Sequence, residues 1–269
     1  MDLLMRLKLT LLPLEANPAV PLNYNYPLSA AIYKLLAQAS PEYARWLHDQ
    51  GYQSRDERFM KLFTFSRLDI PRVRLSGKTL QAGDDRPWSL QISSPMEEEF
   101  VQNFVLGLFH QQKMEIGGQG AVGRFLIESV EALPAPKFAE RMHGKTLSPM
   151  VVSTMREHKG KLHSYYYRPT DPELAEALRN NLIAKFELVH HRPCENPHLQ
   201  ISFDMHYFKR RQGKVTKLLH IKEGTAEETK VKAFEMPFEM AGNPQLIKIG
   251  WECGLGDKNS LGFGMVEVW

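Results

Sequence analysis

The feature that most constrains this chain is an order of periodic segments that occurs twice. In the first half, alternating segments predict strands and segments with a 3.6-residue period predict helices. Strands are expected at 4–11, 61–66, 88–92 and 122–130, with helices from Pro27 and after Ser94-Pro95. An additional short helix is expected over 41–49, behind the N-cap Ser40. Without that helix, the order is βαββαβ, the ferredoxin-like arrangement.

The second half repeats this plan after the proline-bearing segment LPAPK at 133–137. A strand near 147–154 with a hairpin out to Tyr167 precedes a helix that begins after Asp171-Pro172. Strands follow near 199–208, 214–221 and 231–239, then a short helix from Asn243-Pro244 and a last strand over 262–269. We therefore predict an α+β chain of two tandem ferredoxin-like (RRM-like) βαββαβ domains, at 1–134 and 138–269.

The composition is that of a globular protein. Hydrophobic residues make up 43% and charged residues 24% of the chain, and no apolar stretch reaches the roughly 18 residues of a membrane span. The apolar N-terminus is interrupted by Arg6 and Lys8 and resembles a strand more than a signal peptide. Two cysteines are too few for a disulfide framework, which favours a reducing, cytoplasmic location without membrane attachment.

Positive charge is concentrated in the second half. Residues 1–135 carry 14 Lys and Arg against 15 Asp and Glu, whereas 136–269 carry 20 against 16. The local clusters are REHKGK at 156–161 and KRRQGK at 209–214. Such clusters suit a phosphate backbone, although each alone is equally well explained as a solvated hairpin tip.

A glycine-rich run precedes the last strand. Four glycines at 254, 256, 262 and 264 surround DKNS at 257–260. Glycine lets another chain approach its backbone amides, so with Lys258, Asn259 and Ser260 the run predicts a phosphate cradle. The run follows a helix, so it is neither a Walker loop nor a dinucleotide fingerprint. A tight turn that needs glycine for steric reasons alone carries equal weight.

This run and several other segments resemble one known family. GLGDKNSLGFGMVEV, the opening RLKLTLLPL, YPLSAAIYKLL, RWLHDQG followed by KLFTFS, and LSPMVV are similar to the CRISPR-associated repeat-RNA endoribonucleases of the Cas six family, in the RAMP superfamily. The resemblance extends from residue 6 to residue 268, in the family's order. It implies two ferredoxin-like domains side by side, in agreement with the periodicity.

The resemblance also implies a reaction and its residues. In the family, the ribose 2′-hydroxyl attacks the adjacent phosphate without a metal ion, leaving a 2′,3′-cyclic phosphate and a 5′-hydroxyl. Tyr33 would orient or help deprotonate the 2′-hydroxyl, His48 would move protons, and Lys61 would stabilise the phosphorane. The sequence leaves open which of Tyr33 and His48 is the base. Because the segment 51–60 is long and polar, Arg55 or Arg58 could supply the positive charge instead.

The expected partner is CRISPR repeat RNA, as precursor and as mature guide RNA. The RNA-binding candidates are the glycine-rich run and the basic clusters, namely Gly254, Gly256, Lys258, Asn259, Ser260, Gly262, Gly264, Arg156, Lys159, Lys161, Lys209, Arg210 and Arg211. No cofactor is expected. No metal is expected either, because the chain has no His-x-Glu or Asp-x-Asp pair, and the adjacent His190-His191 would point to opposite sides of a strand.

Two other functions are considered. One is a catalytically weak or inactive repeat-RNA-binding protein, and the other is a tandem ferredoxin-like protein that binds a small ligand or another protein. Formation of a homodimer and membership of an interference complex are left open.

Overall fold

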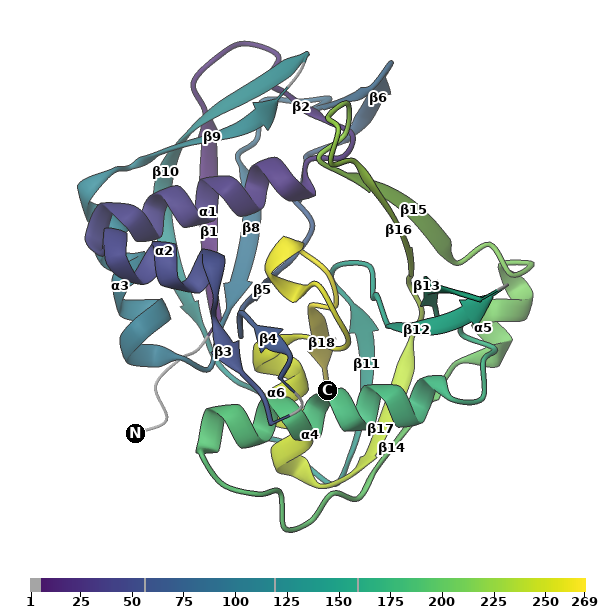
Figure 1. Ribbon diagram of the computed structural model, residues 1–269. Coiled ribbons are helices and arrows are strands. Elements are labelled where there is room, and N and C mark those ends of the chain that lie inside the picture. Colours follow the sequence, from purple (N-terminus) through teal and green to yellow (C-terminus); the bar gives the residue numbers. More distant parts are fainter. Residues whose placement is uncertain (1–5, 56, 119, 159) are drawn as a thin grey trace.

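The protein consists of two α/β domains that lie side by side (Figure 1). The structure is a computed structural model that describes residues 6–55, 57–118, 120–158 and 160–269. The chain crosses from the first domain to the second between Leu133 and Arg141. Within the described residues, no helix is long and apolar enough to cross a membrane.

The first domain is a five-stranded antiparallel sheet in the spatial order β5-β8-β1-β10-β9. The strands are β1 (Arg6–Pro13), β5 (Thr64–Phe65), β8 (Trp88–Ser93), β9 (Lys113–Gly118) and β10 (Ala121–Leu133). Helices α1 (Asn25–Ala39) and α3 (Gln102–His110) lie together on one face of the sheet. The alternation of β1 places Leu7, Leu9 and Leu11 in the core, as predicted.

The second domain repeats this topology with a four-stranded sheet in the order β14-β17-β11-β18. Its strands are β11 (Arg141–Thr146), β14 (Leu199–Phe203), β17 (Phe238–Gly242) and β18 (Val266–Val268), and its helices are α4 (Leu174–His190) and α6 (Pro244–Cys253). In both sheets the first strand lies between the third and the fourth, which is the ferredoxin-like order once the edge strand β9 is set aside. The predicted fold class is therefore confirmed.

Shorter elements leave the two sheets and carry several of the candidate residues. In the first domain these are α2 (Pro41–Asp49), the hairpin β3 (Tyr52–Gln53) and β4 (Phe59–Met60), and a small sheet of β2 (Ala19–Pro21), β6 (Arg74–Ser76) and β7 (Thr79–Gln81). In the second they are the hairpin β12 (Ser153–His158) and β13 (Lys161–Tyr166), α5 (Met205–Arg210), and the hairpin β15 (Thr216–Ile221) and β16 (Thr229–Phe234). Figure 1 shows the β15–β16 hairpin reaching toward the first domain, where Glu223 accepts hydrogen bonds from Asn23 (2.7 Å) and Lys78 (3.0 Å).

Several predicted strands were wrong in extent. The expected strand at 147–154 is not part of the main sheet. Strand β11 takes that place, and Gly144 of β11 lies against the Phe238 ring. The expected strand at 199–208 ends at Phe203, because Asp204 caps α5 by accepting from the Tyr207 backbone amide at 2.8 Å. The expected strand at 231–239 is two strands, β16 and β17, separated by a segment that contains Pro237.

The first domain also departs from the expected pattern at three places. Strand β5 covers only Thr64–Phe65 of the predicted 61–66, since Leu62 has a φ of +49° that does not continue a strand. Strand β9 was not predicted. The helix after Ser94-Pro95 starts with a short π-helical segment, Glu97–Val101, before α3. These features are set by packing rather than by local periodicity.

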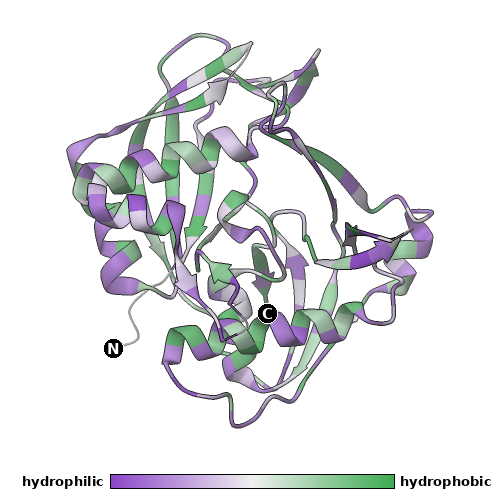
Figure 2. Cartoon of the chain, in the orientation of Figure 1, coloured by the Kyte–Doolittle hydropathy of each residue, from purple (hydrophilic) through white to green (hydrophobic). Residues whose placement is uncertain are grey.

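The glycine-rich run joins the two domains into one folded unit. One continuous hydrophobic core contains residues of both sheets, and Figure 2 shows hydrophobic segments alternating with hydrophilic ones along α1 and α4, which cover those sheets. The run enters the first domain, where Asn25 of α1 donates to the Leu261 carbonyl at 2.9 Å and Thr64 of β5 donates to the Phe263 carbonyl at 3.1 Å. Gly262 has a φ of +75° and leaves no room for a Cβ against the Phe65 ring.

Candidate active site

Three side chains from separate elements converge on one surface of the first domain. Tyr33 lies on α1, His48 in the last turn of α2, and Lys61 directly after strand β4. The Tyr33 and His48 rings meet edge to face, with centroids 5.3 Å apart and planes at 84°. Lys61 Nζ donates to the His48 carbonyl at 2.8 Å. The residues that the family resemblance selected are thus neighbours in space.

The hairpin β3–β4 brings Lys61 back to His48. Tyr52 and Gln53 pair with Met60 and Phe59, so the polar segment folds on itself instead of lengthening the connection. Gly51, at φ +74°, opens the hairpin, and a Cβ there would lie only 2.9 Å from Lys61 Cδ. The length of this segment made the position of Lys61 uncertain in the sequence. The structure accounts for that length, because the segment forms a hairpin.

The alternative cation Arg55 lies on another side of that hairpin. Its Nε is 3.5 Å from a carboxylate oxygen of Glu187 on α4, in the second domain. Arg58 belongs to the same loop, and both line a cavity of about 330 Å³ against α4. Lys61, rather than Arg55, is therefore the cation beside His48.

His48 is accessible and oriented by its neighbour. Helix α2 has the predicted bounds because Ser40 caps it, accepting from the Tyr43 amide at 3.3 Å, and Pro41 occupies its first turn. The His48 side chain is 63% exposed, and its Nδ1 lies 2.8 Å from Asp49 Oδ1. This contact leaves Nε2 free of Asp49 and available for proton exchange with a bound molecule.

Tyr33 is half-buried, with its ring against Phe63 at 5.7 Å between centroids. Burial raises the pKa of its hydroxyl well above the usual range, and a hydrogen bond from the Ser260 side chain only partly offsets that rise. The phenol therefore keeps its proton at neutral pH and acts as a hydrogen-bonding group. Ser260 was expected only as an RNA contact, and no local pattern signals its approach to Tyr33.

Lys61 is less buried than Tyr33. Partial desolvation lowers the pKa of its ammonium, and the nearby Asp49 carboxylate opposes that shift. The cluster thus combines an imidazole, a phenol and an ammonium group.

The glycine-rich run makes mostly internal contacts. Lys185 of α4 donates to the carbonyls of Gly254 (2.7 Å) and Gly256 (2.9 Å) and to the Asn259 side chain (2.7 Å). Asn259 also donates to the Phe263 carbonyl at 2.9 Å, and the four glycines are buried. In this run Lys258 exposes its side chain.

The predicted basic clusters lie elsewhere, on the second domain. Arg156 is on β12, Lys161 begins β13, Lys209 and Arg210 end α5, and Arg211 follows them. Lys159 lies outside the described residues. None of the described members of these clusters belongs to the Tyr33–His48–Lys61 cluster.

The prediction that His190 and His191 lie on a strand was wrong. His190 ends helix α4 and His191 is its C-cap, at a φ of +52°, so the two do not alternate along a strand. The reason is that α4 runs one turn beyond the last predicted core position, Phe186. Over the residues that the structure describes, no three His, Cys, Asp or Glu side chains come together as a metal site.

Comparison with known proteins places both halves in one family. Residues 19–131 match the family described as CRISPR-associated protein Cas6, N-terminal, and residues 133–268 match CRISPR associated protein Cas6, C-terminal. The CRISPR-associated endoribonuclease Cas6 1 of Methanocaldococcus jannaschii is 34% identical to the chain over 247 residues, which cover 92% of this chain and 86% of that protein.

Two solved structures agree in fold over nearly the whole chain. One, a CRISPR associated protein Cas6, is 31% identical with a TM-score of 0.73, and the match covers 98% of each chain. The other, an RAMP protein binding different RNA substrates, is 26% identical with a TM-score of 0.79 and covers 98% of this chain and 99% of that one. The chain therefore belongs to the Cas6 family of CRISPR-associated endoribonucleases.

Proposed function

We propose that this chain cuts the repeat RNA of a CRISPR precursor transcript without a metal ion and so produces mature guide RNAs. The products would be a 2′,3′-cyclic phosphate and a 5′-hydroxyl. The convergence of Tyr33, His48 and Lys61 carries the proposal, because it supplies an orienting donor, a proton-transfer group and a cation. The relationship to Cas6 endoribonucleases supplies the substrate class.

The three residues divide the chemistry in this scheme, and His48 acts first as base and then as acid. The 2′-hydroxyl loses its proton to the His48 imidazole as the 2′-oxygen bonds to phosphorus, and the bond to the 5′-oxygen breaks. The departing 5′-oxygen takes its proton from the imidazolium. Tyr33 hydrogen-bonds the attacking oxygen. Its raised pKa keeps the phenol protonated, so Tyr33 is unsuited to act as the base. Lys61 offsets the negative charge that develops on the phosphoryl oxygens.

The decisive experiment is cleavage of the chain's own repeat RNA in the presence of EDTA, with analysis of the product ends. We expect cleavage to continue and to leave a cyclic phosphate. A His48→Ala variant should lose about 10²- to 10⁴-fold in single-turnover rate. His110→Ala is the matched control, since His110 is also an exposed histidine in the last turn of a helix. Loss of activity in EDTA that Mg²⁺ restores would contradict the metal-independent reaction.

The alternative is a relative that binds repeat RNA but cuts it weakly or not at all. The similarity to an RAMP protein binding different RNA substrates is the observation that favours it. Intact RNA after long incubation with an excess of protein would support this alternative. Turnover number does not separate the two, because a nuclease that holds its product stops after one cut.

A further inference from the structure

A cavity of about 460 Å³ opens in the second domain between the hairpin strand β13, the strand β16 and the helix α5. We call it the aromatic pocket, and the residues that matter to its chemistry are Tyr165, Tyr167, Arg168, Phe208, Lys232 and Phe234. Its volume falls in the range of about 300–1,000 Å³ typical of small-molecule sites. None of the residues that line the pocket belongs to the Tyr33–His48–Lys61 cluster.

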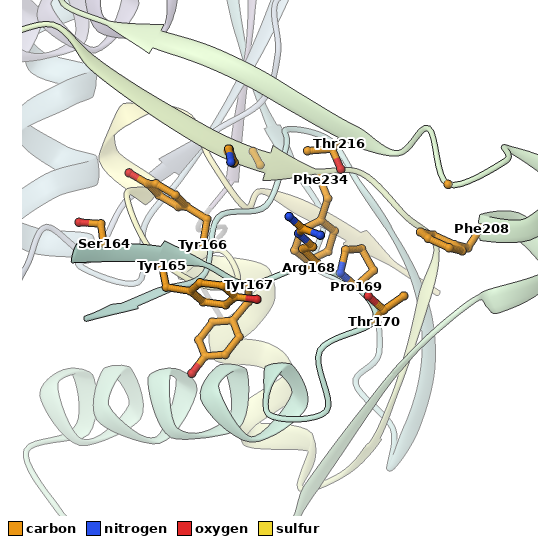
Figure 3. A pocket seen from close by; sticks show the side chains of 13 residues that line it. Ser164, Tyr165, Tyr166, Tyr167, Arg168, Pro169, Thr170, Phe208, Thr216 and Phe234 are labelled. Atoms are coloured by element: carbon orange, nitrogen blue, oxygen red, sulfur yellow. The ribbon is translucent and has the colours of Figure 1, made fainter. Parts of the chain in front are cut away.

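Aromatic rings form the sides of this pocket. The Tyr165 and Tyr167 rings are 5.6 Å apart between centroids and nearly perpendicular, at 89°. In Figure 3 they lie on one side of Arg168, and Phe208 lies on the other. These three rings are half-buried, whereas Phe234 is buried and forms the floor. Half-exposed rings offer stacking surfaces to a planar ligand.

Cationic side chains surround the same rings. The Arg156 guanidinium lies 3.7 Å from the Tyr165 ring centroid and 5.5 Å from that of Tyr167. Arg168 and Lys232 are exposed in the pocket wall. A planar base and its phosphate need both kinds of group, since stacking holds the first and positive charge holds the second.

The acidic residues nearby are already engaged. Asp171 accepts from the Tyr165 hydroxyl at 2.7 Å and from the Arg168 backbone amide at 2.9 Å. Glu173 lies 3.8 Å from Arg156. The cations Arg156, Arg168 and Lys232 therefore outnumber the two carboxylates. The Asp171 carboxylate holds the pocket wall in place. The pocket can accept an anion.

The fold brings parts of the two basic segments of the sequence near this pocket. One cluster belongs to the β12–β13 hairpin, which supplies Arg156 and the tyrosines, and the other follows Phe208 at the end of α5. Gly213, inside the second cluster, is part of the pocket wall. Residues of two segments that are separate in the sequence, Arg156 on β12 and Gly213 after α5, thus approach one site.

The glycine-rich run links the pocket to the candidate active site. At the base of the hairpin, Asp257 accepts from the Ser153 amide at 2.7 Å and from its hydroxyl at 2.8 Å. Three residues later, Ser260 contacts Tyr33. The run thus connects the base of the hairpin that carries Tyr165 to the helix that carries Tyr33.

We propose that the aromatic pocket binds one unpaired nucleotide of the repeat RNA, at a distance from the cut. The base stacks against Phe208, and the phosphate lies against Arg168 and Arg156. This inference rests on the proposed function for the identity of the RNA. Stacking is tolerant of base identity, so the pocket selects an unstacked nucleotide rather than a sequence.

The test couples a protein substitution to a change in the RNA. Repeat RNAs with a single abasic ribose at successive positions are titrated against His48→Ala protein, in which the RNA stays intact. At one position we expect the missing base to lower affinity about 5- to 150-fold, the effect of one stacked base. In the His48→Ala/Phe208→Ala protein, intact RNA should bind more weakly by a similar factor, and the abasic change at that position should have no further effect.

Controls separate this inference from folding and from the proposed function. Phe208→Trp should retain the coupling, and Arg168→Gln tests the phosphate contact in a variant that keeps every pocket ring. Arg141→Gln removes an exposed arginine outside the pocket and should leave the coupling unchanged. If the wild-type protein cuts the repeat but the effect of no abasic position depends on Phe208, the proposed nucleotide site is wrong. The proposed nuclease activity is then unaffected. Competitive binding of free adenosine or uridine monophosphate, without coupling between Phe208 and an abasic position, would also contradict the proposal. The pocket would then be a site for a free nucleotide.

Discussion

At the scale of single residues, environment rather than residue type sets the role of each candidate group. Tyr33 and His48 touch through their rings, yet Tyr33 is half-buried against Phe63 while the His48 side chain is 63% exposed. Burial raises the pKa of the Tyr33 hydroxyl, which supports His48 rather than Tyr33 as the base in the proposed reaction.

Replacing the Tyr33 hydroxyl should therefore slow the reaction without abolishing it. We expect Tyr33→Phe to lower the single-turnover rate about 10- to 100-fold, because one oriented donor is lost while the proton-transfer group remains. Tyr43→Phe is the control, since Tyr43 is also half-buried and its hydroxyl contacts Tyr52 at 3.3 Å. A loss for Tyr33→Phe as large as that of His48→Ala would make Tyr33 the base instead.

The lowered pKa of Lys61 gives a prediction about alkaline pH. The ammonium is charged below its pKa and neutral above it, so phosphorane stabilisation is lost as the pH rises through that value. Since burial lowers this pKa, the single-turnover rate should fall at a lower pH than an ordinary lysine would give. Lys61→Arg should move that alkaline limb to higher pH, because arginine stays charged. Identical alkaline limbs for both proteins, after subtraction of hydroxide-catalysed RNA cleavage, would remove Lys61 charge from the mechanism.

At the scale of elements, short irregular segments position the site. Helix α2 was predicted to the residue, because Ser40 and Pro41 define its start locally. The hairpin β3–β4 was seen only as a long polar connection, although it is what returns Lys61 to His48. The glycine-rich run was predicted as a phosphate cradle, whereas its contacts in the structure are with α4 and the first domain.

Lys185 tests whether the run positions Ser260. Burial lowers the pKa of Lys185 to about 8, so its ammonium is charged at pH 7 while it holds Gly254, Gly256 and Asn259. Lys185→Met keeps similar bulk but removes these bonds, and we expect the free energy of unfolding to fall by about 1–3 kcal/mol. The cleavage rate of the folded variant should fall as well.

Urea denaturation and single-turnover cleavage measure the two effects of Lys185→Met separately. Lys34→Met on α1 is the control, since that lysine is exposed. Unchanged cleavage by folded Lys185→Met protein would show that the position of Ser260 does not depend on this lysine.

At the scale of the whole molecule, the two domains are held together by buried polar contacts as well as by a shared core. Arg6 on β1 donates to the carbonyls of Trp251 (2.7 Å) and Val266 (2.9 Å) in the second domain, and its guanidinium lies 3.9 Å from the Trp251 ring centroid. Only 2% of Arg6 is exposed. Because the glycine-rich run reaches Tyr33 across this interface, the relative position of the domains bears on the site.

Removing the Arg6 contacts should destabilise the whole protein. We expect Arg6→Met to lower the free energy of unfolding by about 2–4 kcal/mol, since two buried carbonyls lose their charged donor. Arg141→Met removes an exposed arginine, 69% accessible and paired with Glu239, and should cost less than about 1 kcal/mol. Equal unfolding midpoints in urea for the two variants would contradict a special role for Arg6.

The sequence by itself determined most of the main helices, the duplicated ferredoxin-like plan, the family and the three residues that form the candidate site. These follow from local periodicity, from capping residues and from motifs, which are properties of neighbouring positions. Only the tertiary structure decided that Ser260 reaches Tyr33, that Lys61 rather than Arg55 lies beside His48, and that Arg156 and Gly213 lie at one aromatic pocket. Burial and long-range contact depend on how distant segments pack, and that packing raises the pKa of a tyrosine or brings residues of separate segments together.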